Sequence, residues 1–405
     1  HIVSRRQRQM CIRDRYYGWQ NTSLGNVFIF GSELKAIKSF PELNLAIDRG
    51  SLSLFLSHAY VPCPHSIYED IFSLEPGEIL EVSIDEKTYK RKKYWDVSEV
   101  IKNNTVNKFN GTSGDAVKKL ESLITSSVKR QMISDVPLGA FLSGGIDSST
   151  IVSLMQSQSS KPIKTFTIGF NEKGFDEAKY AKSIAKHLGT DHTELYVDAD
   201  SAMKVIPEMH SIYCEPFADP TQIPNYIVSK LANKDVKVAL SGDGGDELFA
   251  GYSRYNHIDN LWKKLNYFHP SIRNMISKSL KLIFKQSIYT NYESDKLNYF
   301  SKRIVSGSDV LKYKKIDQLY SHVITQIPYS EEVVIDGFKK DSKLDHLKPK
   351  FGNISAIELM MATDTVNYLP DDILTKVDRA AMRTSLETRV PFLDHKIIEF
   401  TWSLP

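Results

Sequence analysis

The sequence has few cysteines, no long apolar run and almost no net charge, and each absence excludes a class of protein. Three cysteines in 405 residues do not suggest a disulfide framework, and no pair has the close spacing of a zinc knuckle. No run of about eighteen apolar residues is present, and the amino terminus lacks the apolar core of a signal peptide, which disfavours membrane spanning and secretion. The formal net charge is +3, and five arginines lie among the first fifteen residues. The remainder is close to neutral, so we expect a cytoplasmic protein that binds neither nucleic acid nor membrane.

What is present is typical of an ordinary globular enzyme. Hydrophobic residues make up 41% of the chain and charged residues 25%, and at roughly 150 residues per domain the length predicts two or three domains. Both ends look truncated. Residues 1–15 have no apolar periodicity and are expected to be a non-native leader, with a processed tail and a basic interaction arm as the alternatives. A helical pattern that starts at Ile397 is cut short at Pro405.

The pattern of apolar residues divides the chain into two unequal parts. Short strands and turns between 16 and 97 predict a small β-rich unit, with strands at 27–30 and 78–84. The stretch at 98–114 is rich in Asn, Thr, Ser and Gly and is predicted to be a linker. A second domain is predicted from 115 to 405.

Strands and helices alternate in the first half of this second domain. Such alternation predicts a parallel sheet covered on both faces, with ligands at the carboxyl ends of the strands. The predicted strands are 136–142, 164–170, 193–197 and 236–240, and the helices between them are 148–156, 176–188 and 222–231. From 252 to about 351 the pattern becomes irregularly helical.

The segment LSGGIDSS at 142–149 joins a predicted buried strand to a predicted helix. Gly144 and Gly145 have no Cβ atom and let backbone N–H groups converge on an anion, while serine hydroxyls and the helix start add donors. A Walker-type loop has a lysine after its last glycine, whereas this segment has Asp147. A carboxylate beside polyphosphate is repulsive unless a divalent cation separates them, so Asp147 is a candidate Mg²⁺ ligand. The alternative is a plain strand-to-helix turn with a side-chain cap.

A second glycine-rich loop, SGDGGDE at 241–247, follows another apolar strand. Its three carboxylates, Asp243, Asp246 and Glu247, lie within five residues and would repel one another in a dry fold, so a metal or a cationic partner is expected. The alternative is a solvated loop. Two such loops at strand ends of one parallel sheet favour a ligand site more strongly than either loop alone.

The third segment runs from Tyr368 to Asp394 and concentrates charged side chains. Pro370 and the aspartates after it are typical of a helix start. Four charged residues then fall within eleven positions: Arg379, Arg383, Glu387 and Arg389. They predict either a fork for a substrate carboxylate or a salt-bridged helix face.

Together the three segments resemble the asparagine synthetase family. The resemblance extends from Phe28 to Pro405, because FGSELKAI, SIYEDIFSLEPGEILEV and KKYWDV, between 30 and 97, resemble the last part of that family's glutaminase domain. The fold it implies is α/β: a parallel-sheet ATP-pyrophosphatase domain, of the adenine nucleotide alpha hydrolase type, with extra helices. The remnant of a β-rich N-terminal-nucleophile glutaminase domain would precede it.

The same resemblance implies the reaction and its partners. Aspartate and ATP would give an aspartyl-adenylate and pyrophosphate, and ammonia, free or from glutamine, would displace AMP to form asparagine. ATP and Mg²⁺ are the implied cofactors, and the expected assembly is a homodimer.

Site residues are implied by matching the family's motifs position by position. The pyrophosphate end would be held by Ser143, Gly144, Gly145, Asp147 and Ser148, with Asp147 and Asp246 as Mg²⁺ ligands. The adenosine and α-phosphate pocket would be lined by Phe141, Ile168, Ser241 and Gly242. The implied catalytic residues are Asp243, Glu387 and Arg389, and the implied aspartate pocket contains Glu247, Glu387 and Arg389.

The sequence also departs from the family pattern. Asp243 stands where well-studied members have Glu, and no cysteine stands at the amino terminus, where the family's glutamine-hydrolysing nucleophile is found. Cys11, Cys63 and Cys214 are internal, and a lysine that the family uses would fall beyond Pro405. This chain is therefore expected to use free ammonia at best.

Two other hypotheses about the function are compatible with these motifs. Relatives amidate sugar acids of polysaccharides or close β-lactam rings, so the acceptor carboxylate need not be aspartate. The chain could instead be an inactive nucleotide-binding paralogue.

Overall fold

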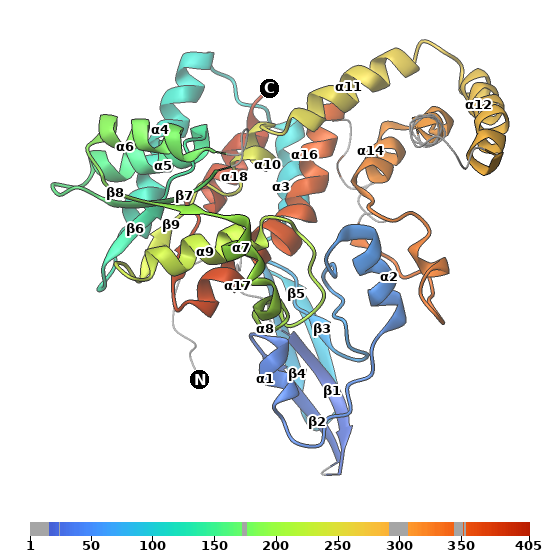
Figure 1. Ribbon diagram of the computed structural model, residues 1–405, viewed down its shortest axis with the longest axis horizontal. Helices are drawn as coiled ribbons and strands as arrows, with labels where there is room; N and C mark the ends of the chain where they lie inside the picture. Colours follow the sequence, from blue (N-terminus) through green and yellow to red (C-terminus); the bar gives the residue numbers. More distant parts are fainter. Residues whose placement is uncertain (1–15, 24, 172–175, 291–306, 344–350, 352–353) are drawn as a thin grey trace.

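The structure is a computed structural model that describes residues 16–23, 25–171, 176–290, 307–343, 351 and 354–405. Residues 1–15, which the sequence predicts to be a leader, lie outside the described residues, and so does Cys11. Two parts are visible in Figure 1: a small β-rich unit in blue and cyan, and a larger α/β part that contains the remaining elements.

The small unit is built from two short antiparallel sheets. Its three-stranded sheet has the order β2-β1-β3, with bounds Tyr16–Thr22 for β1, Gly25–Gly31 for β2 and Phe72–Ser73 for β3. A hairpin of β4 (Glu78–Ser83) and β5 (Thr88–Lys93) forms the other. Two helices, α1 (Leu34–Lys38) and α2 (Arg49–His58), cover the three-stranded sheet.

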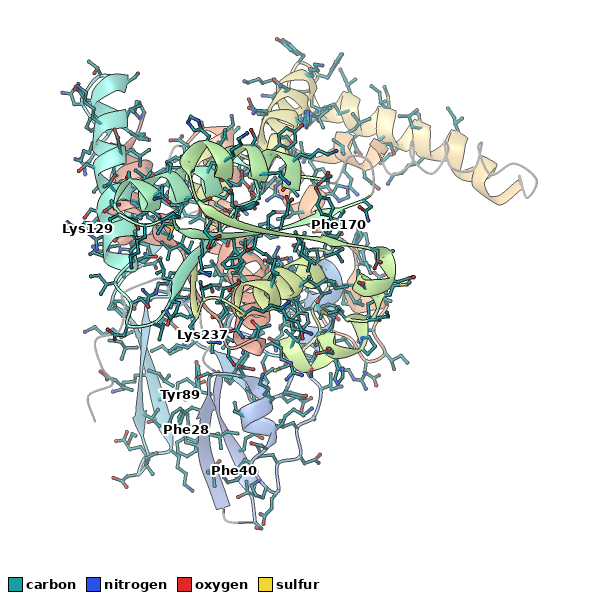
Figure 2. The ribbon with its side chains drawn as sticks, turned by 60° about the vertical axis from the view of Figure 1, so that its left-hand side comes forward. Phe28, Phe40, Tyr89, Lys129, Phe170 and Lys237 are labelled. Carbon is teal, nitrogen blue, oxygen red and sulfur yellow. The ribbon has the colours of Figure 1, made fainter. Side chains whose placement is uncertain are left out.

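Aromatic side chains join the two sheets of this unit. The ring of Tyr17 on β1 lies 6.3 Å from Phe28 on β2 and 5.3 Å from Tyr89 on β5. Figure 2 shows Phe28 and Tyr89 at this junction. A separate apolar core, which includes Tyr16, Leu34 and Ile71, packs the helices against β1 and β2. The sequence predicted the strands at 27–30 and 78–84, but not β1.

A five-stranded parallel sheet forms the centre of the larger part. Its order is β10-β9-β6-β7-β8, and every neighbouring pair is parallel. The strands are β6 (Leu138–Phe141), β7 (Lys164–Phe170), β8 (Asp191–Val197), β9 (Val238–Leu240) and β10 (Glu387–Arg389). The predicted α/β class with a parallel sheet is thus confirmed, and β10 is an edge strand that the sequence analysis did not predict.

Helices cover both faces of this sheet. Successive side chains along a strand point to opposite faces, and apolar side chains are buried on each face. Val238 and Leu240 face one core, which contains residues of α4 (Ser113–Gln131), α5 (Ile146–Ser157) and α6 (Ala178–Leu188). Ala239, between them, faces the other core, with residues of α9 (Gln222–Ala232) and α17 (Thr375–Arg383). Figure 1 shows these two groups of helices on opposite sides of the sheet.

The polar stretch predicted as a linker contains a helix. α3 (Val97–Val106) begins at Asp96, whose side chain accepts a hydrogen bond from the Ser98 N–H, and it packs against α18 (His395–Ser403). Ile101 is fully buried in the same core as the central sheet. Val97 and Ile101, four positions apart, place apolar side chains of this helix in that core, although the composition of the stretch predicted a loop.

Figure 1 shows α11 and α12 projecting away from the sheet on one side, while α7, α8 and α10 lie closer to the centre of the molecule. These and the other helices have the following bounds: α7 (Ala199–Met203), α8 (Met209–Tyr213), α10 (Gly245–Phe249), α11 (Ser253–Leu265), α12 (Pro270–Thr290), α14 (Ile316–Ile324) and α16 (Ala356–Val366). Short helical turns lie at Ile206–Glu208 (η1), Val310–Lys312 (η2), Ser330–Glu332 (η3) and Pro391–Leu393 (η5), and a π-helical turn, η4 (Leu369–Leu374), leads into α17. Within the residues that the structure describes, no helix combines the length and the hydropathy needed to cross a bilayer.

Candidate functional site

The first glycine-rich loop connects β6 to α5 at the carboxyl edge of the sheet. The hydroxyls of Ser143 and Ser148 lie 2.9 Å apart, and the Ser143 N–H donates to the Ser148 hydroxyl. Gly144 has a φ of +88°, and a Cβ atom there would lie 2.7 Å from the Cβ of Tyr180. Glycine is therefore required at this position both by the backbone angle and by the neighbouring helix.

The second loop, after β9, packs directly on the first. A Cβ atom on Gly242 would lie 2.6 Å from the backbone nitrogen of Ser148, and one on Gly245 would lie 2.4 Å from the carboxyl carbon of Asp147. The two loops predicted from sequence to meet at one sheet edge thus touch, and the absence of side chains on two glycines makes that contact possible.

A cleft of about 880 Å³ opens above the two loops. Most of the residues implied by the resemblance line it: Phe141, Ser143, Gly145, Asp147, Ser148, Ile168, Ser241, Gly242, Asp243, Asp246 and Glu247. Gly144 is not a lining residue and supports the loop from behind, against α6.

The charged side chains that line this cleft are all acidic. They are Asp147, Glu177, Asp243, Asp246 and Glu247, and no Lys, Arg or His is among the described lining residues. Burial, together with the charges of Asp246 and Asp243, raises the pKa of Asp147 to about 6. Burial also raises the pKa of Asp246, which Arg254 partly offsets. The cleft is therefore short of positive charge, and a cation bound there would be stabilised strongly.

The donor set of the cleft fits Mg²⁺ bound together with a phosphate. No group of three or more His, Cys, Asp or Glu side chains in the described part of the chain forms a complete protein metal site. Mg²⁺, however, is commonly held by one or two carboxylates with the rest of its shell supplied by water and substrate phosphates. Asp147 and Asp246 meet that requirement, since they belong to two loops in contact and the charge of Asp246 raises the pKa of Asp147.

Glu387 and Arg389 lie elsewhere. The Arg389 Nε donates to Glu387 at 2.9 Å, and its Nη1 donates to the carbonyl oxygens of Gln131 and Ile133 at 2.6 and 2.7 Å. Neither residue lines the cleft. The arginine instead ties β10 to the end of α4, so the structure does not bring these two residues together with the other predicted site residues.

A buried lysine behind the cleft wall was missed by the sequence analysis. Lys376 on α17 lies 3.1 Å from Asp219, and Asp219 accepts hydrogen bonds from the N–H and hydroxyl of Thr221, which lines the cleft. Its helix also buries Asp378 and Arg379, so no pattern in the sequence marked this lysine in particular. Its partner, Asp219, comes from a distant loop that the sequence could not pair with it.

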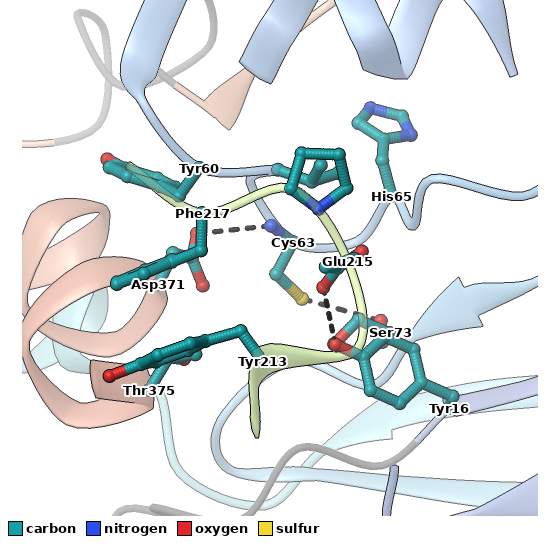
Figure 3. Close-up of a pocket in the computed structure, with 12 residues that line it drawn as sticks. Tyr16, Tyr60, Cys63, His65, Ser73, Tyr213, Glu215, Phe217, Asp371 and Thr375 are labelled. Carbon is teal, nitrogen blue, oxygen red and sulfur yellow. Dashed lines mark hydrogen bonds between the residues drawn. The ribbon is translucent and has the colours of Figure 1, made fainter. Parts of the chain in front are cut away.

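A second, much smaller cavity of about 20 Å³ lies between the β-rich unit and the α/β part (Figure 3). Tyr16 and Cys63 line it from one side, and Tyr213 and Asp371 from the other. The Cys63 thiol donates to the Ser73 carbonyl, and burial raises the pKa of that thiol well above its ordinary value. Burial likewise raises the pKa of Cys214. Neither described cysteine has the environment of an activated nucleophile.

Comparison with known families gives two matches. Residues 119–405 match the family model described as asparagine synthase, and residues 1–95 match the model described as a glutamine amidotransferase domain.

Several curated proteins are similar over most of this chain. A putative asparagine synthetase [glutamine-hydrolyzing] 2 of Methanocaldococcus jannaschii is 31% identical over 393 residues, which are 94% of this chain and 71% of that protein. Asparagine synthetase [glutamine-hydrolyzing] 1 of Bacillus subtilis is 29% identical over 410 residues, covering 100% of this chain and 60% of the relative. A putative asparagine synthetase of Mycobacterium tuberculosis is 30% identical over 396 residues, with 92% and 55% covered. The chain thus spans between 55% and 71% of the length of these relatives.

Proposed function

The chain belongs to the asparagine synthase family, and we propose that it carries the synthetase centre of an ATP-dependent, amide-forming ligase. In this proposal the acceptor is aspartate, which is activated as an aspartyl-adenylate and converted to asparagine by ammonia. Its proposed domains are a glutamine amidotransferase segment at 16–97, a connecting segment at 98–114 and an ATP-pyrophosphatase domain at 115–405.

The observation that carries the proposal is the contact between the two glycine-rich loops in a cleft lined only by acidic charged residues. ATP brings four negative charges near pH 7, which such a cleft repels unless divalent cations accompany the nucleotide. Backbone N–H groups of the first loop and the start of α5 supply the remaining positive potential. This combination favours a magnesium–nucleotide complex over an uncharged or a purely anionic ligand.

Each lining residue has a role in the proposed reaction. Ser143, Gly145 and Ser148 bind the departing pyrophosphate, while Phe141 and Ile168 contact the adenosine. Asp147 and Asp246 would hold Mg²⁺, which when bound neutralises charge on the phosphates. Asp243 faces the cleft from the second loop, and burial raises its pKa. Glu247, beside it, is assigned to the acceptor end of the cleft.

The chain's own residues mainly position the reactants and exclude water. A carboxylate oxygen of the acceptor attacks the α-phosphorus and pyrophosphate leaves, after which ammonia attacks the acyl carbon, AMP leaves and one proton is released. Hydrolysis competes with the second step, so a cleft with buried walls protects the intermediate. Arg389 is not assigned to the acceptor, because its guanidinium is occupied by Glu387 and two carbonyl oxygens.

The proposed test is the exchange of labelled pyrophosphate into ATP by the full-length protein. We expect exchange that depends on aspartate. Exchange with a different carboxylate alone, such as a sugar acid, would replace the proposed acceptor, and absence of exchange with every carboxylate would leave a nucleotide-binding role.

Asp147→Asn is the variant that tests the metal assignment. We expect exchange to fall by about 100-fold or more, as when a main electrostatic contact to the transition state is lost. Without metal the variant should melt at the same or a higher temperature, because the ionised Asp147 carboxylate is disfavoured by burial and by Asp246. Exchange that survives in a folded Asp147→Asn protein would remove this residue from the proposed site.

A further inference from the structure

Behind the wall of the cleft, three polar side chains converge on one buried carboxylate oxygen. Asp364 on α16 is 1% exposed, and its Oδ2 accepts hydrogen bonds from Arg254, Tyr255 and Tyr320, each at 2.6 Å. A buried carboxylate with three donors is held in one orientation, and it fixes the donors in turn.

Arg254 is also held between aromatic rings. The centre of its guanidinium lies 4.0 Å from the ring of Tyr252, 5.0 Å from that of Tyr368 and 5.7 Å from that of Tyr255. Stacking of a planar guanidinium on tyrosine is favourable, and more so where water is partly excluded. The arginine therefore transmits the fixed position of Asp364 to the ring of Tyr252.

Tyr252 brings this network to the cleft. Both Tyr252 and Glu247 line the cleft, and the Tyr252 hydroxyl donates to the buried Glu247 carboxylate at 2.6 Å. Next to Tyr252, a Cβ atom on Gly251 would lie 2.0 Å from Oδ1 of Asp246, so the same turn packs tightly on a second cleft carboxylate.

We propose that Arg254 is a positioning residue for the acceptor end of the cleft: stacked on Tyr252 and anchored to Asp364, it holds the Tyr252 hydroxyl against Glu247. The inference rests on the function proposed above, which assigns Glu247 to the acceptor. Arg254 itself is not a lining residue and acts through Tyr252.

A double-mutant cycle on pyrophosphate exchange tests this role. Arg254→Met and Tyr252→Phe should each raise the KM for the acceptor carboxylate by about 10-fold, the effect expected when one hydrogen bond to a charged group is lost, and should change the KM for ATP much less. If Arg254 acts through the Tyr252 hydroxyl, the double variant should resemble Tyr252→Phe alone. Multiplicative effects on KM, or equal effects on both substrates, would overturn the proposal.

Two further variants separate positioning from folding. Arg254→Lys keeps a cation for Asp364 but cannot stack flat between two rings, so we expect it to regain most of the melting temperature lost in Arg254→Met without regaining the acceptor KM. Tyr320→Phe is the matched control: it removes another donor to Asp364 that neither lines the cleft nor contacts Tyr252, and it should lower the melting temperature while both KM values stay unchanged.

A crystal structure of Arg254→Lys decides the matter independently of activity. The Tyr252 hydroxyl should move out of hydrogen-bond distance from Glu247, whereas an unchanged hydrogen bond would overturn the positioning role. If the wild-type protein exchanges pyrophosphate with no carboxylate, the proposed function fails, and this structural comparison still tests the link between Arg254 and Tyr252.

Discussion

Asp219 and Asp372 show how two identical side chains acquire different charges in one cluster. Burial would raise the pKa of Asp219, but Lys376 and the hydrogen bonds from Thr221 lower it below its usual value. Burial and repulsion by the charge of Asp219 together raise the pKa of Asp372 to about 8. Lys376, 3.8 Å away, offsets only part of this increase. Near pH 7 one ammonium is therefore paired with one carboxylate and one carboxylic acid.

This assignment predicts opposite results for two isosteric substitutions. Asp219→Asn leaves Lys376 buried without its main partner and should lower the free energy of unfolding by about 3 kcal/mol. Asp372→Asn mimics the protonated acid and should raise the free energy of unfolding at pH 7, because the wild-type carboxyl, ionised in the unfolded chain, must take up a proton on folding. Urea unfolding of both variants measures these differences.

The pH dependence gives the sign of the Asp372 effect. Between the unfolded pKa of 3.8 and the folded value of about 8, the folded protein binds more protons at this site. Its contribution to stability is therefore complete below pH 4 and is lost as the pH rises through 8. Asp372→Asn should abolish that part of the decline, and a variant that is less stable than the wild type at pH 9 would contradict the assignment.

At the scale of elements, the site depends on how closely two strand-to-helix loops approach each other. β6 and β9 are neighbours in the sheet, so the loops that follow them are adjacent, and glycine at 242 lets their backbones touch. The sequence predicted the adjacency, since parallel strands end at the same edge, but it did not predict which glycine would bear the contact.

Gly242→Ala tests this contact. A methyl group 2.6 Å from the Ser148 nitrogen must push the loops apart, which we expect to lower the free energy of unfolding by about 2 kcal/mol and pyrophosphate exchange by about 100-fold. Gly114→Ala, on α4, is the matched control because its added methyl group meets nothing closer than 3.7 Å. It should be neutral or slightly stabilising, and equal losses in both variants would show that crowding at the loops is not the cause.

At the scale of the whole molecule, buried polar contacts join the β-rich unit to the α/β part. The Asp371 carboxylate accepts a hydrogen bond from the Cys63 N–H at 3.1 Å (Figure 3). The same carboxylate lies 3.6 Å from the Lys343 ammonium. The Tyr16 hydroxyl donates to Glu215 at 2.6 Å, and Arg379 lies 3.4 Å from Glu33. These contacts predict that the two parts unfold together.

Asp371→Asn should uncouple them. The substitution leaves the buried Lys343 without its nearest carboxylate, at a cost of about 3 kcal/mol, so calorimetry should show the single wild-type transition split or broadened toward lower temperature. Glu99→Gln breaks an ion pair with Lys102 in which both side chains are more than half exposed, and it should change stability by less than about 0.5 kcal/mol. A single, unshifted transition in Asp371→Asn would mean that this contact does not couple the two parts.

The sequence by itself determined the α/β class, the alternation of strands and helices from 136 to 240 and the two acidic glycine-rich loops. These features are local: periodicity, turn residues and charge lie within a few positions of one another, and the rule that parallel strands end at one edge brings the loops together.

Only the tertiary structure decided what depends on contacts between distant segments. β10 is three residues long and has no strand pattern of its own; it is a strand because it pairs with β9. Arg389 was predicted to bind a substrate carboxylate, but in the fold its guanidinium donates to Glu387 and to two carbonyl oxygens. Arg254 pairs with Asp364 and Lys376 with Asp219, and in each case the two residues lie more than one hundred positions apart. An ionisable side chain acquires its role from what surrounds it after folding, and spacing along the chain does not contain that information.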